Sequence, residues 1–157
     1  MIKNVKDLVQ KMESHIDADR LSAAYAYNVR VDSPEIALRG LQDKNINIQR
    51  AWAARDDYPV TPEIMDTLVF SKDHKLREQA CKKNHVLSSE QLEHLLQDKN
   101  VEVIASLLKR KDIEIPKEYI EKGLQSETQE LRESYERYVQ RIHESKCGES
   151  QEYIYEL

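Results

Sequence analysis

Glycine, proline and cysteine are all scarce in this sequence. Its 157 residues include 3 Gly, 4 Pro and 2 Cys. So little glycine argues against tight β-hairpins and glycine-rich phosphate loops, because both need backbone conformations that glycine adopts most easily. Cys81 and Cys147 are too few for a disulfide framework, and we interpret them as unpaired thiols of a reducing compartment.

Long apolar runs are also missing. No segment approaches the roughly 18 apolar residues of a membrane-spanning helix, and the first residues form no apolar signal region. These absences predict a soluble cytoplasmic protein that does not enter a membrane.

Charged residues, by contrast, are abundant, at 34% of residues with a net charge of -5. High charge with few helix breakers is typical of helices with solvated outer faces, whereas a nucleic-acid-binding protein is usually basic.

A short stretch occurs twice in the chain. Residues 41–48 read LQDKNINI and residues 96–103 read LQDKNVEV, so five of eight positions are identical. Two of the other three positions exchange Ile for Val. A match of this kind in so short a chain indicates an internal repeat. We interpret the stretch as the turn between two helices, with Asn45 and Asn100 capping the second helix.

Helix-start signals recur along the whole chain, each followed by apolar residues at helical spacing. Ser88 and Gln91 have the spacing of a capping box, and Pro34 and Pro62 occupy first helical positions. The expected starts are at Asn4, Asp17 or Asp19, Ser33, Asn45, Thr61, Asp73, Ser88, Asn100, Pro116 and near Ser126. The last helix looks longer than the others, as terminal capping elements often are.

These signals predict an all-α protein built from about five helix-turn-helix units of roughly 27–28 residues. The units lie near residues 8–35, 36–63, 64–90, 91–118 and 119–145. One helix pair cannot bury its apolar stripe alone, whereas stacked pairs bury it against each other. We therefore expect one α-solenoid domain over residues 1–145, a right-handed superhelix, with residues 146–157 forming a flexible or docking tail.

The repeated pattern resembles short HEAT-like and leucine-rich-repeat-variant families. It reads Asp43, then Ile-Gln-Arg-Ala at 48–51, then Trp-Ala-Ala at 52–54, then Thr-Pro-Glu at 61–63 and a new aliphatic run from Ile64. The resemblance covers residues 36–124 well and implies a curved helical array that binds a partner. The fourth unit departs from the pattern, since Ile104 and Ala105 stand where an Arg is usual.

Basic residues gather where the second helix of each unit ends. They are Arg55, Lys82, Lys83, Lys109, Arg110, Lys111 and Arg137. In a solenoid such positions align, and the aligned cations would form a basic ridge for phosphates or an acidic partner. The alternative is that these cations complement the negative ends of helix dipoles. The sequence favours the second interpretation slightly.

Trp52, the only tryptophan, has two interpretations. If it points outward near Asp56, it could anchor a partner or stack on a base, as Trp and Asp do in HEAT-like DNA glycosylases. However, the repeat register places Trp52 with Ala80, Leu107 and Tyr135, which indicates the core. We favour the core position.

No pattern indicates catalysis or metal binding. The five His residues form no Glu-x-x-His, His-Glu-x-x-His or Cys-x-x-Cys motif, and the adjacent Asp56 and Asp57 lie at an expected turn. We therefore predict no metal, no cofactor and no enzymatic activity.

The favoured function is a noncatalytic protein-binding module, an adaptor or small protein inhibitor, that uses the concave face of the second helices. The expected contact residues are Gln49, Arg50, Ala53, Arg55, Lys75, Glu78, Lys82, Lys83, Glu102, Ser106, Lys109 and Arg110. One alternative is a nucleic-acid-binding or DNA glycosylase-type protein that uses the basic ridge. Another is an acidic decoy of a nucleic-acid-binding protein, because acidic residues outnumber basic ones after residue 112.

The C-terminal residues form a separate candidate. Glu152 to Leu157 alternates polar and apolar residues, and Tyr153, Ile154, Tyr155 and Leu157 are the apolar members. This pattern indicates either a short docking motif, for a partner or for another copy of the chain, or a disordered end.

Overall fold

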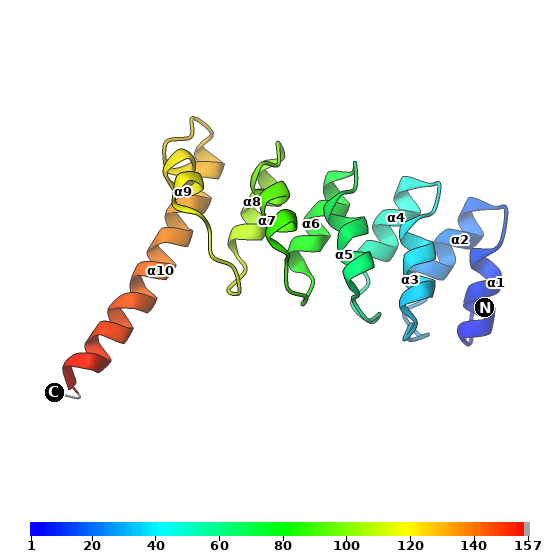
Figure 1. Cartoon of the computed structure of the whole chain (residues 1–157). Helices are drawn as coiled ribbons and strands as arrows, with labels where there is room; N and C mark the ends of the chain where they lie inside the picture. The colour runs from blue at the N-terminus through cyan, green and yellow to red at the C-terminus, as the bar shows by residue number, and fades with distance from the viewer. Residues whose placement is uncertain (156–157) are drawn as a thin grey trace.

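The structure is a computed structural model that describes the backbone of residues 1–155 and the side chains of residues 1–146. Within residues 1–155 it contains ten helices and no strand, which confirms the all-α prediction. The helices are α1 (Val5–Met12), α2 (Asp17–Ala24), α3 (Pro34–Leu41), α4 (Ile46–Ala53), α5 (Pro62–Val69), α6 (His74–Lys82), α7 (Ser89–Leu96), α8 (Val101–Leu108), α9 (Lys117–Leu124) and α10 (Gln129–Tyr155). Figure 1 shows them following one another along an elongated molecule, with the N-terminus at one end and α10 at the other.

Most helices begin at the residues that the sequence indicated. The side-chain oxygens of Ser33 and Thr61 accept hydrogen bonds from the third residue of α3 and α5, so one exposed N–H of each helix is satisfied. Ser88 and Gln91 form the expected capping box at α7. Asn4, Asn45, Asp73 and Asn100 cap α1, α4, α6 and α8 in the same way.

Two helix starts differ from the expectation. The N-cap of α2 is Ile16, whose apolar side chain makes no capping bond, and Asp17 and Asp19 lie inside the first turn. Asp19 instead accepts a hydrogen bond from Ser14 Oγ at 2.7 Å. The last helix begins at Gln129 rather than near Ser126, since Ser126 Oγ accepts from the backbone N–H of Thr128 in the preceding turn.

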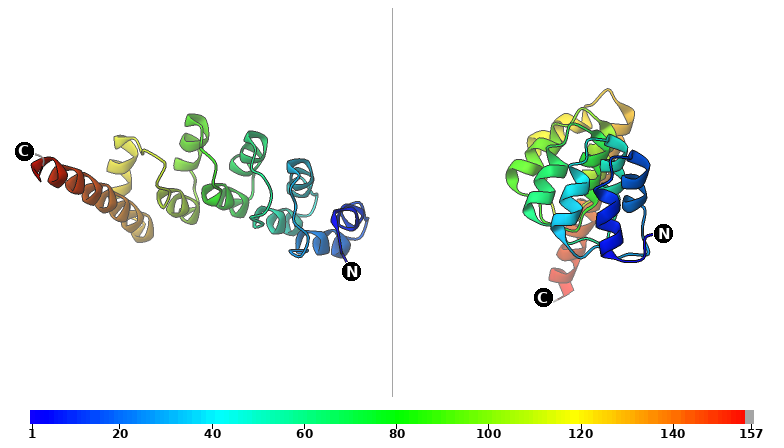
Figure 2. Two further views of the ribbon diagram at one scale, coloured as in Figure 1. Left: turned by 90° about the horizontal axis from the view of Figure 1, so that it is seen from below. Right: turned by 90° about the vertical axis from the view of Figure 1, so that its right-hand side faces the viewer.

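The helices form two layers, visible from below in the left view of Figure 2. We call α1, α3, α5, α7 and α9 the first helices and α2, α4, α6, α8 and α10 the second helices. Each second helix packs on the next one along the chain, from α2 on α4 through to α8 on α10. Among the first helices, α3 packs on α5 and α5 on α7.

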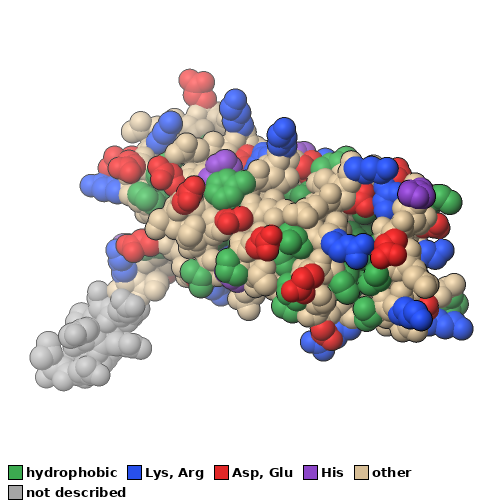
Figure 3. Space-filling model, turned by 45° about the vertical axis from the view of Figure 1, so that its right-hand side comes forward, with side chains coloured by type: hydrophobic (Ala, Val, Ile, Leu, Met, Phe, Trp, Pro, Cys, Tyr) green, Lys and Arg blue, Asp and Glu red, His purple; other side chains and the backbone are tan. Residues whose placement is uncertain are grey.

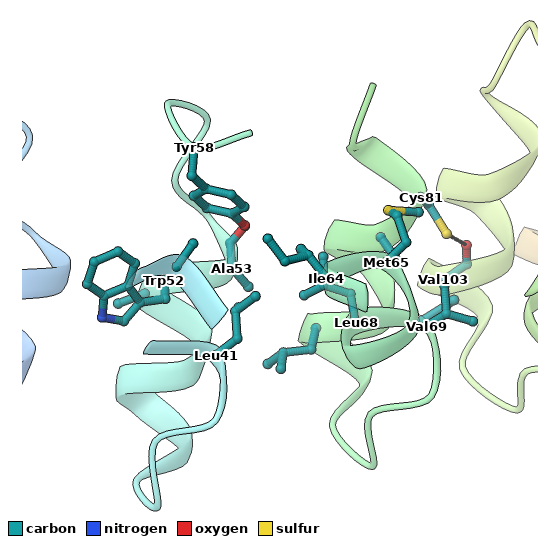
Figure 4. Packing of buried hydrophobic residues seen from close by; sticks show 14 of the residues in the cluster. Leu41, Trp52, Ala53, Tyr58, Ile64, Met65, Leu68, Val69, Cys81 and Val103 are labelled. Carbon is teal, nitrogen blue, oxygen red and sulfur yellow. Dashed lines mark hydrogen bonds between the residues drawn. The ribbon is translucent and has the colours of Figure 1, made fainter. Parts of the chain in front are cut away.

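The core lies between the two layers and extends from α1 to α10. Figure 4 shows its middle part, where Leu41 and Trp52 lie on one side and Ile64 and Leu68 on the other. All four side chains are almost completely buried. The burial of Trp52 confirms the core interpretation and leaves this ring no surface on which to stack a base.

Two glycines make room for the largest core side chains. A Cβ added to Gly40 would overlap the ring of Trp52, and a Cβ added to Gly123 would overlap the ring of Tyr135. Gly40 and Gly123 lie in α3 and α9, directly across from α4 and α10. The absent side chain on the first helix therefore compensates for the aromatic side chain on the second helix, as close packing requires.

The described part of the chain contains no helix with the length and apolar character needed to cross a membrane. At the C-terminus, α10 continues through Tyr155, into the segment that the sequence predicted to be a flexible or docking tail. This segment contains one glycine and no proline, and a single glycine is tolerated inside a helix. The side chains of Tyr153, Ile154, Tyr155 and Leu157 lie outside those described, so the docking motif stays a prediction.

Candidate functional site

The second helices have two edges that are held together differently. At the edge where each second helix begins, which we call the turn edge, arginines pair with aspartates. Arg20 Nε donates to Asp43 Oδ2 at 2.9 Å, and Arg77 Nε donates to Asp98 Oδ2 at 2.6 Å. Arg20 and Arg77 each lie four residues after the N-cap of their helix, and each donates also to the backbone carbonyl of a serine in the turn before it. Each pair therefore joins one second helix to the turn before the next.

The same position changes in the two remaining junctions. In α4 it holds Gln49, which reaches the carbonyl of Asp43 in its own turn. The next residue, Arg50, joins α4 to the start of α6 instead, with its Nη2 at 2.6 Å from Oδ1 of Asp73, the N-cap of α6. This hydrogen bond lowers the pKa of Asp73 below its ordinary value. In α8 the position holds Ile104, which is buried and forms no ion pair.

At the opposite edge, which we call the return edge, the chain leaves each second helix. Here Arg55 is completely buried. Its guanidinium donates to the carbonyls of Ala24 at 3.1 Å and Val29 at 2.8 Å, and to both oxygens of Asp57. These hydrogen bonds satisfy carbonyls at and beyond the C-terminal end of α2. The hydrogen bonds from Arg55 are also the main reason why the pKa of Asp57 lies below its ordinary value.

Two later basic residues repeat this arrangement. Lys83 Nζ donates to the carbonyl of Arg55 at 2.6 Å, where α4 ends. Arg110 donates to the carbonyls of Cys81, Lys83 and His85 at distances of 2.7 to 3.1 Å, where α6 ends. Arg55, Lys83 and Arg110 are thus mostly buried and complement the C-terminal ends of the preceding helices. This is the geometry expected if cations stabilise the negative ends of helix dipoles.

The predicted basic ridge therefore divides into two groups. Arg55, Lys83 and Arg110 form internal contacts, whereas the other members remain exposed. The exposed members are Lys82, Lys109, Lys111 and Arg137. Any partner that approaches the return edge meets this second group.

Three exposed lysines surround a cleft between α6 and α8, which we call the α6–α8 cleft. It has a volume of about 510 Å³, and its lining includes Lys82, Lys109 and Lys111 together with Glu78, Asn84 and Ser106. Lys82 forms an ion pair with Glu78 at 3.2 Å. Among the described residues, the side-chain ammonium groups of Lys109 and Lys111 have no hydrogen-bond or ion-pair partner. The cleft therefore presents unneutralised positive charge to solvent.

The other expected contact residues are distributed unevenly. Lys75 is exposed and lies 3.8 Å from both Glu78 and Glu102. Ser106 is partly exposed in the α6–α8 cleft. Ala53 is completely buried, because it lies on the side of α4 that packs into the core (Figure 4). The twelve expected residues therefore do not form one continuous exposed surface.

The sequence did not single out Asn84, Tyr25 and Tyr27 as exposed groups. Asn84 lines the α6–α8 cleft and also a neighbouring cleft of about 510 Å³ beside Tyr58. Tyr25 and Tyr27 are 55% and 63% exposed, and their rings meet edge to face with centroids 6.2 Å apart. Their position after the end of α2 is a usable signal, because residues beyond a helix end no longer follow its apolar stripe.

Chemistry that needs a reactive thiol or a metal finds little support in the described residues. Cys81 is buried, and burial raises the pKa of its thiol to about 12. At neutral pH the thiol is therefore protonated and a poor nucleophile. The described residues also contain no group of three or more His, Cys, Asp or Glu side chains placed to hold a metal ion.

Acidic and basic side chains alternate over the face drawn in Figure 3, without an extended region of one sign. A phosphate track along a nucleic acid would need a longer basic stripe than this face offers.

Comparison of the chain with protein-family models, with curated proteins and with solved structures finds no match.

Proposed function

We propose that this chain is a short α-solenoid of HEAT-like helix-pair repeats, and that it acts as a noncatalytic protein-binding module. Its partner is another protein, which it would serve as an adaptor or inhibit by occupying a surface. The repeat assignment is supported by contacts that recur between successive pairs. Arg20 and Arg77 pair with aspartates in equivalent turns, and Arg55 and Arg110 complement equivalent helix ends.

The binding face that we propose is the exposed side of the second helices. Successive second helices pack on one another at every step, and closer packing in one layer makes that layer the inner, concave one. The observation that carries the proposal is the α6–α8 cleft on this side. It is open, and two of its lysines take no part in the contacts that hold the array together.

A nucleic-acid partner is the less favoured alternative. The burial of Arg55 and Lys83 and the hydrogen bonds of Arg110 to three backbone carbonyls remove three cations from the possible phosphate track, and the burial of Trp52 removes the stacking group. A protein partner needs neither a continuous basic stripe nor an exposed tryptophan.

The proposal is tested by site-specific photo-crosslinking in living cells. A photo-reactive amino acid replaces Ala54, which directly follows α4, or Ser106 in α8, or else Glu93 or Glu121 as controls on the first helices. We expect discrete protein adducts from the first two positions and none from the controls. Adducts that disappear after nuclease treatment would replace the proposal with nucleic-acid binding. Equal adducts from all four positions would mean that no specific face binds.

A further inference from the structure

The α6–α8 cleft carries an excess of positive charge in a protein whose net charge is negative. Its lining contains five cationic side chains and two carboxylates. The whole chain has a net charge of -5. A concave surface between protein walls concentrates the electric field of the charges that line it, so this local excess attracts anions despite the overall charge.

The carboxylates near the cleft do not cancel this excess. Glu78 is paired with Lys82 and with Lys75, and Asp112 is paired with Arg110 at 2.8 Å. Asp56, which borders the neighbouring cleft, lies 3.7 Å from Lys83. Each acidic group therefore has a cation of its own.

Lys109 and Lys111 are left over after this pairing. Both are exposed, and neither has a partner among the described residues. Their ammonium groups sit on flexible stems, and Lys82 can turn toward the same space when it leaves Glu78. The three lysines thus offer mobile point charges. A rigid planar fork, which suits phosphate in two-point contacts, is not offered by these lysines. The guanidinium of Arg110 is already engaged by carbonyls and Asp112.

The positive surface is also short. Directly after α4, the residues equivalent to Lys82 and Asn84 are Ala54 and Asp56, so the excess ends before the preceding junction. Nucleic acids carry phosphates at regular intervals and gain affinity by contacting many of them. A segment with a few neighbouring carboxylates matches a patch of this length better.

We infer that the α6–α8 cleft binds an acidic peptide segment of the partner protein, with Asp or Glu side chains placed between Lys82, Lys109 and Lys111. Asn84 and Ser106 line the same cleft and supply neutral hydrogen-bonding groups for the peptide backbone. This inference rests on the proposed function and adds to it the chemistry of the partner.

The test measures binding of a labelled flexible peptide of Glu and Gly with blocked ends, using fluorescence anisotropy. The control peptide has Gln in place of every Glu. We expect the wild-type chain to bind the Glu peptide at least about tenfold more tightly than the Gln peptide, with affinity falling as salt is added.

A matched pair of variants locates the binding. The cleft variant carries Lys82→Glu, Lys109→Glu and Lys111→Glu. The control variant carries Lys44→Glu, Lys72→Glu and Lys99→Glu, which changes the net charge equally at the turn edge, in the turns before α4, α6 and α8. We expect the cleft variant to lose at least about tenfold in affinity for the Glu peptide and the control to lose much less. A cleft variant with Gln at the three positions repeats the measurement with a smaller change in charge.

Several results would overturn the inference. Equal loss in both variants would mean that only net charge matters, and absence of Glu-peptide binding by the wild type would remove the site. Displacement by inorganic phosphate at concentrations well below those of the peptide would assign the cleft to phosphate. Tighter binding to single-stranded DNA, lost in the cleft variant, would assign it to nucleic acid. If protein adducts still form at Ala54 and Ser106 while the Glu peptide fails to bind, only the partner chemistry is wrong and the proposed function stands.

Discussion

Arg50 and Arg55 belong to the same part of the chain but to different edges of the second-helix layer. Arg50 lies on the turn edge, pairs with Asp73 and keeps 40% of its side chain exposed. Arg55 lies on the return edge, contacts several carbonyls and Asp57, and is 0% exposed. At this junction of the turn edge, water partly screens the ion pair, whereas Arg20 and Arg77, which pair with aspartates at two other junctions, are largely buried. The return edge buries cations against the ends of neighbouring helices.

This difference shows which contacts are essential to the array. On the turn edge the pairing residue changes from Arg20 to Arg50 to Arg77, and it is missing where Ile104 occupies the position. On the return edge every junction keeps a cation, ending with Arg141, which donates to the carbonyls of Leu108 and Arg110. The partly exposed ion pair of Arg50 contributes little stability, whereas a helix end left buried without partners is costly.

The largest effect should come from replacing Arg55. Arg55→Leu leaves the carbonyls at the end of α2 without donors and Asp57 without its cation. We expect a loss of about 3–5 kcal/mol in the free energy of unfolding, as when one partner of a buried pair is removed. Urea denaturation followed by circular dichroism measures this loss.

Arg50→Leu is the matched control for this prediction. The substitution is the same, but the ion pair is partly exposed, so the expected loss is about 0.5–1.5 kcal/mol. Similar losses in the two variants would contradict the distinction between the edges.

A smaller effect is expected at the junction that lacks an ion pair. A cleft of about 790 Å³ lies beside α9 there, and its lining includes Ile104, Ser126 and Tyr135. Ile104→Arg should cost about 1–3 kcal/mol, because the guanidinium replaces a buried apolar group and finds no carboxylate at Ser126. Adding Ser126→Asp places a carboxylate where Asp43 and Asp98 lie in the earlier junctions.

The double variant should then recover about 1 kcal/mol relative to the sum of the single changes. A double-mutant cycle in urea measures this coupling. A coupling of zero would mean that the geometry of the turn edge is not shared by the last junction.

The smallest effect is a dependence on pH. Hydrogen bonds from arginines lower the pKa values of Asp57 and Asp73 in the folded state. The stability that these carboxylates contribute is therefore present above the ordinary aspartate pKa of about 4 and is lost as pH falls through the lower folded value. Asp57→Asn and Asp73→Asn should be less stable than the wild type at neutral pH, and the gap should narrow on acidification.

Thermal unfolding at a series of pH values, from neutral to acidic, measures the stability difference between the wild type and each variant. Asp32→Asn is the control. Asp32 pairs with Arg30 in an exposed position and should show little change. We expect a larger gap for Asp57 than for Asp73, because the partner of Asp57 is buried. The reverse order would contradict the comparison between the two edges.

Much of the fold could be predicted from residues that act locally. Ser33, Thr61, Ser88 and Asn100 cap the helices at which the sequence placed them, because an N-cap bond needs only the next three residues. The N-cap of α2 was missed. Asp17 and Asp19 are equally good caps in the sequence, but in the structure their side chains accept hydrogen bonds from Asn45 and Ser14.

The candidate site was predictable only in part. Lys82 and Lys83 are identical neighbours in the sequence, yet Lys82 is exposed and Lys83 is buried beneath the end of α4. Periodicity alone does not separate them, because the second helix ends between the two and the register no longer applies. The sequence predicted that these basic residues align, but it did not show which of them form internal contacts.

The sequence by itself determined where most helices start, which residues form their apolar stripes and where the LQDKN turn recurs. Those features depend on contacts within a few residues. The tertiary structure alone decided that Arg55 is buried and that Arg110 is held by backbone carbonyls, while the side chains of Lys109 and Lys111 have no partner among the described residues. The reason is that most of these helices are short, and such helices are marginal in isolation. Each helix end is completed by the next pair in the array, and that neighbour decides which cation is enclosed and which is left for a partner.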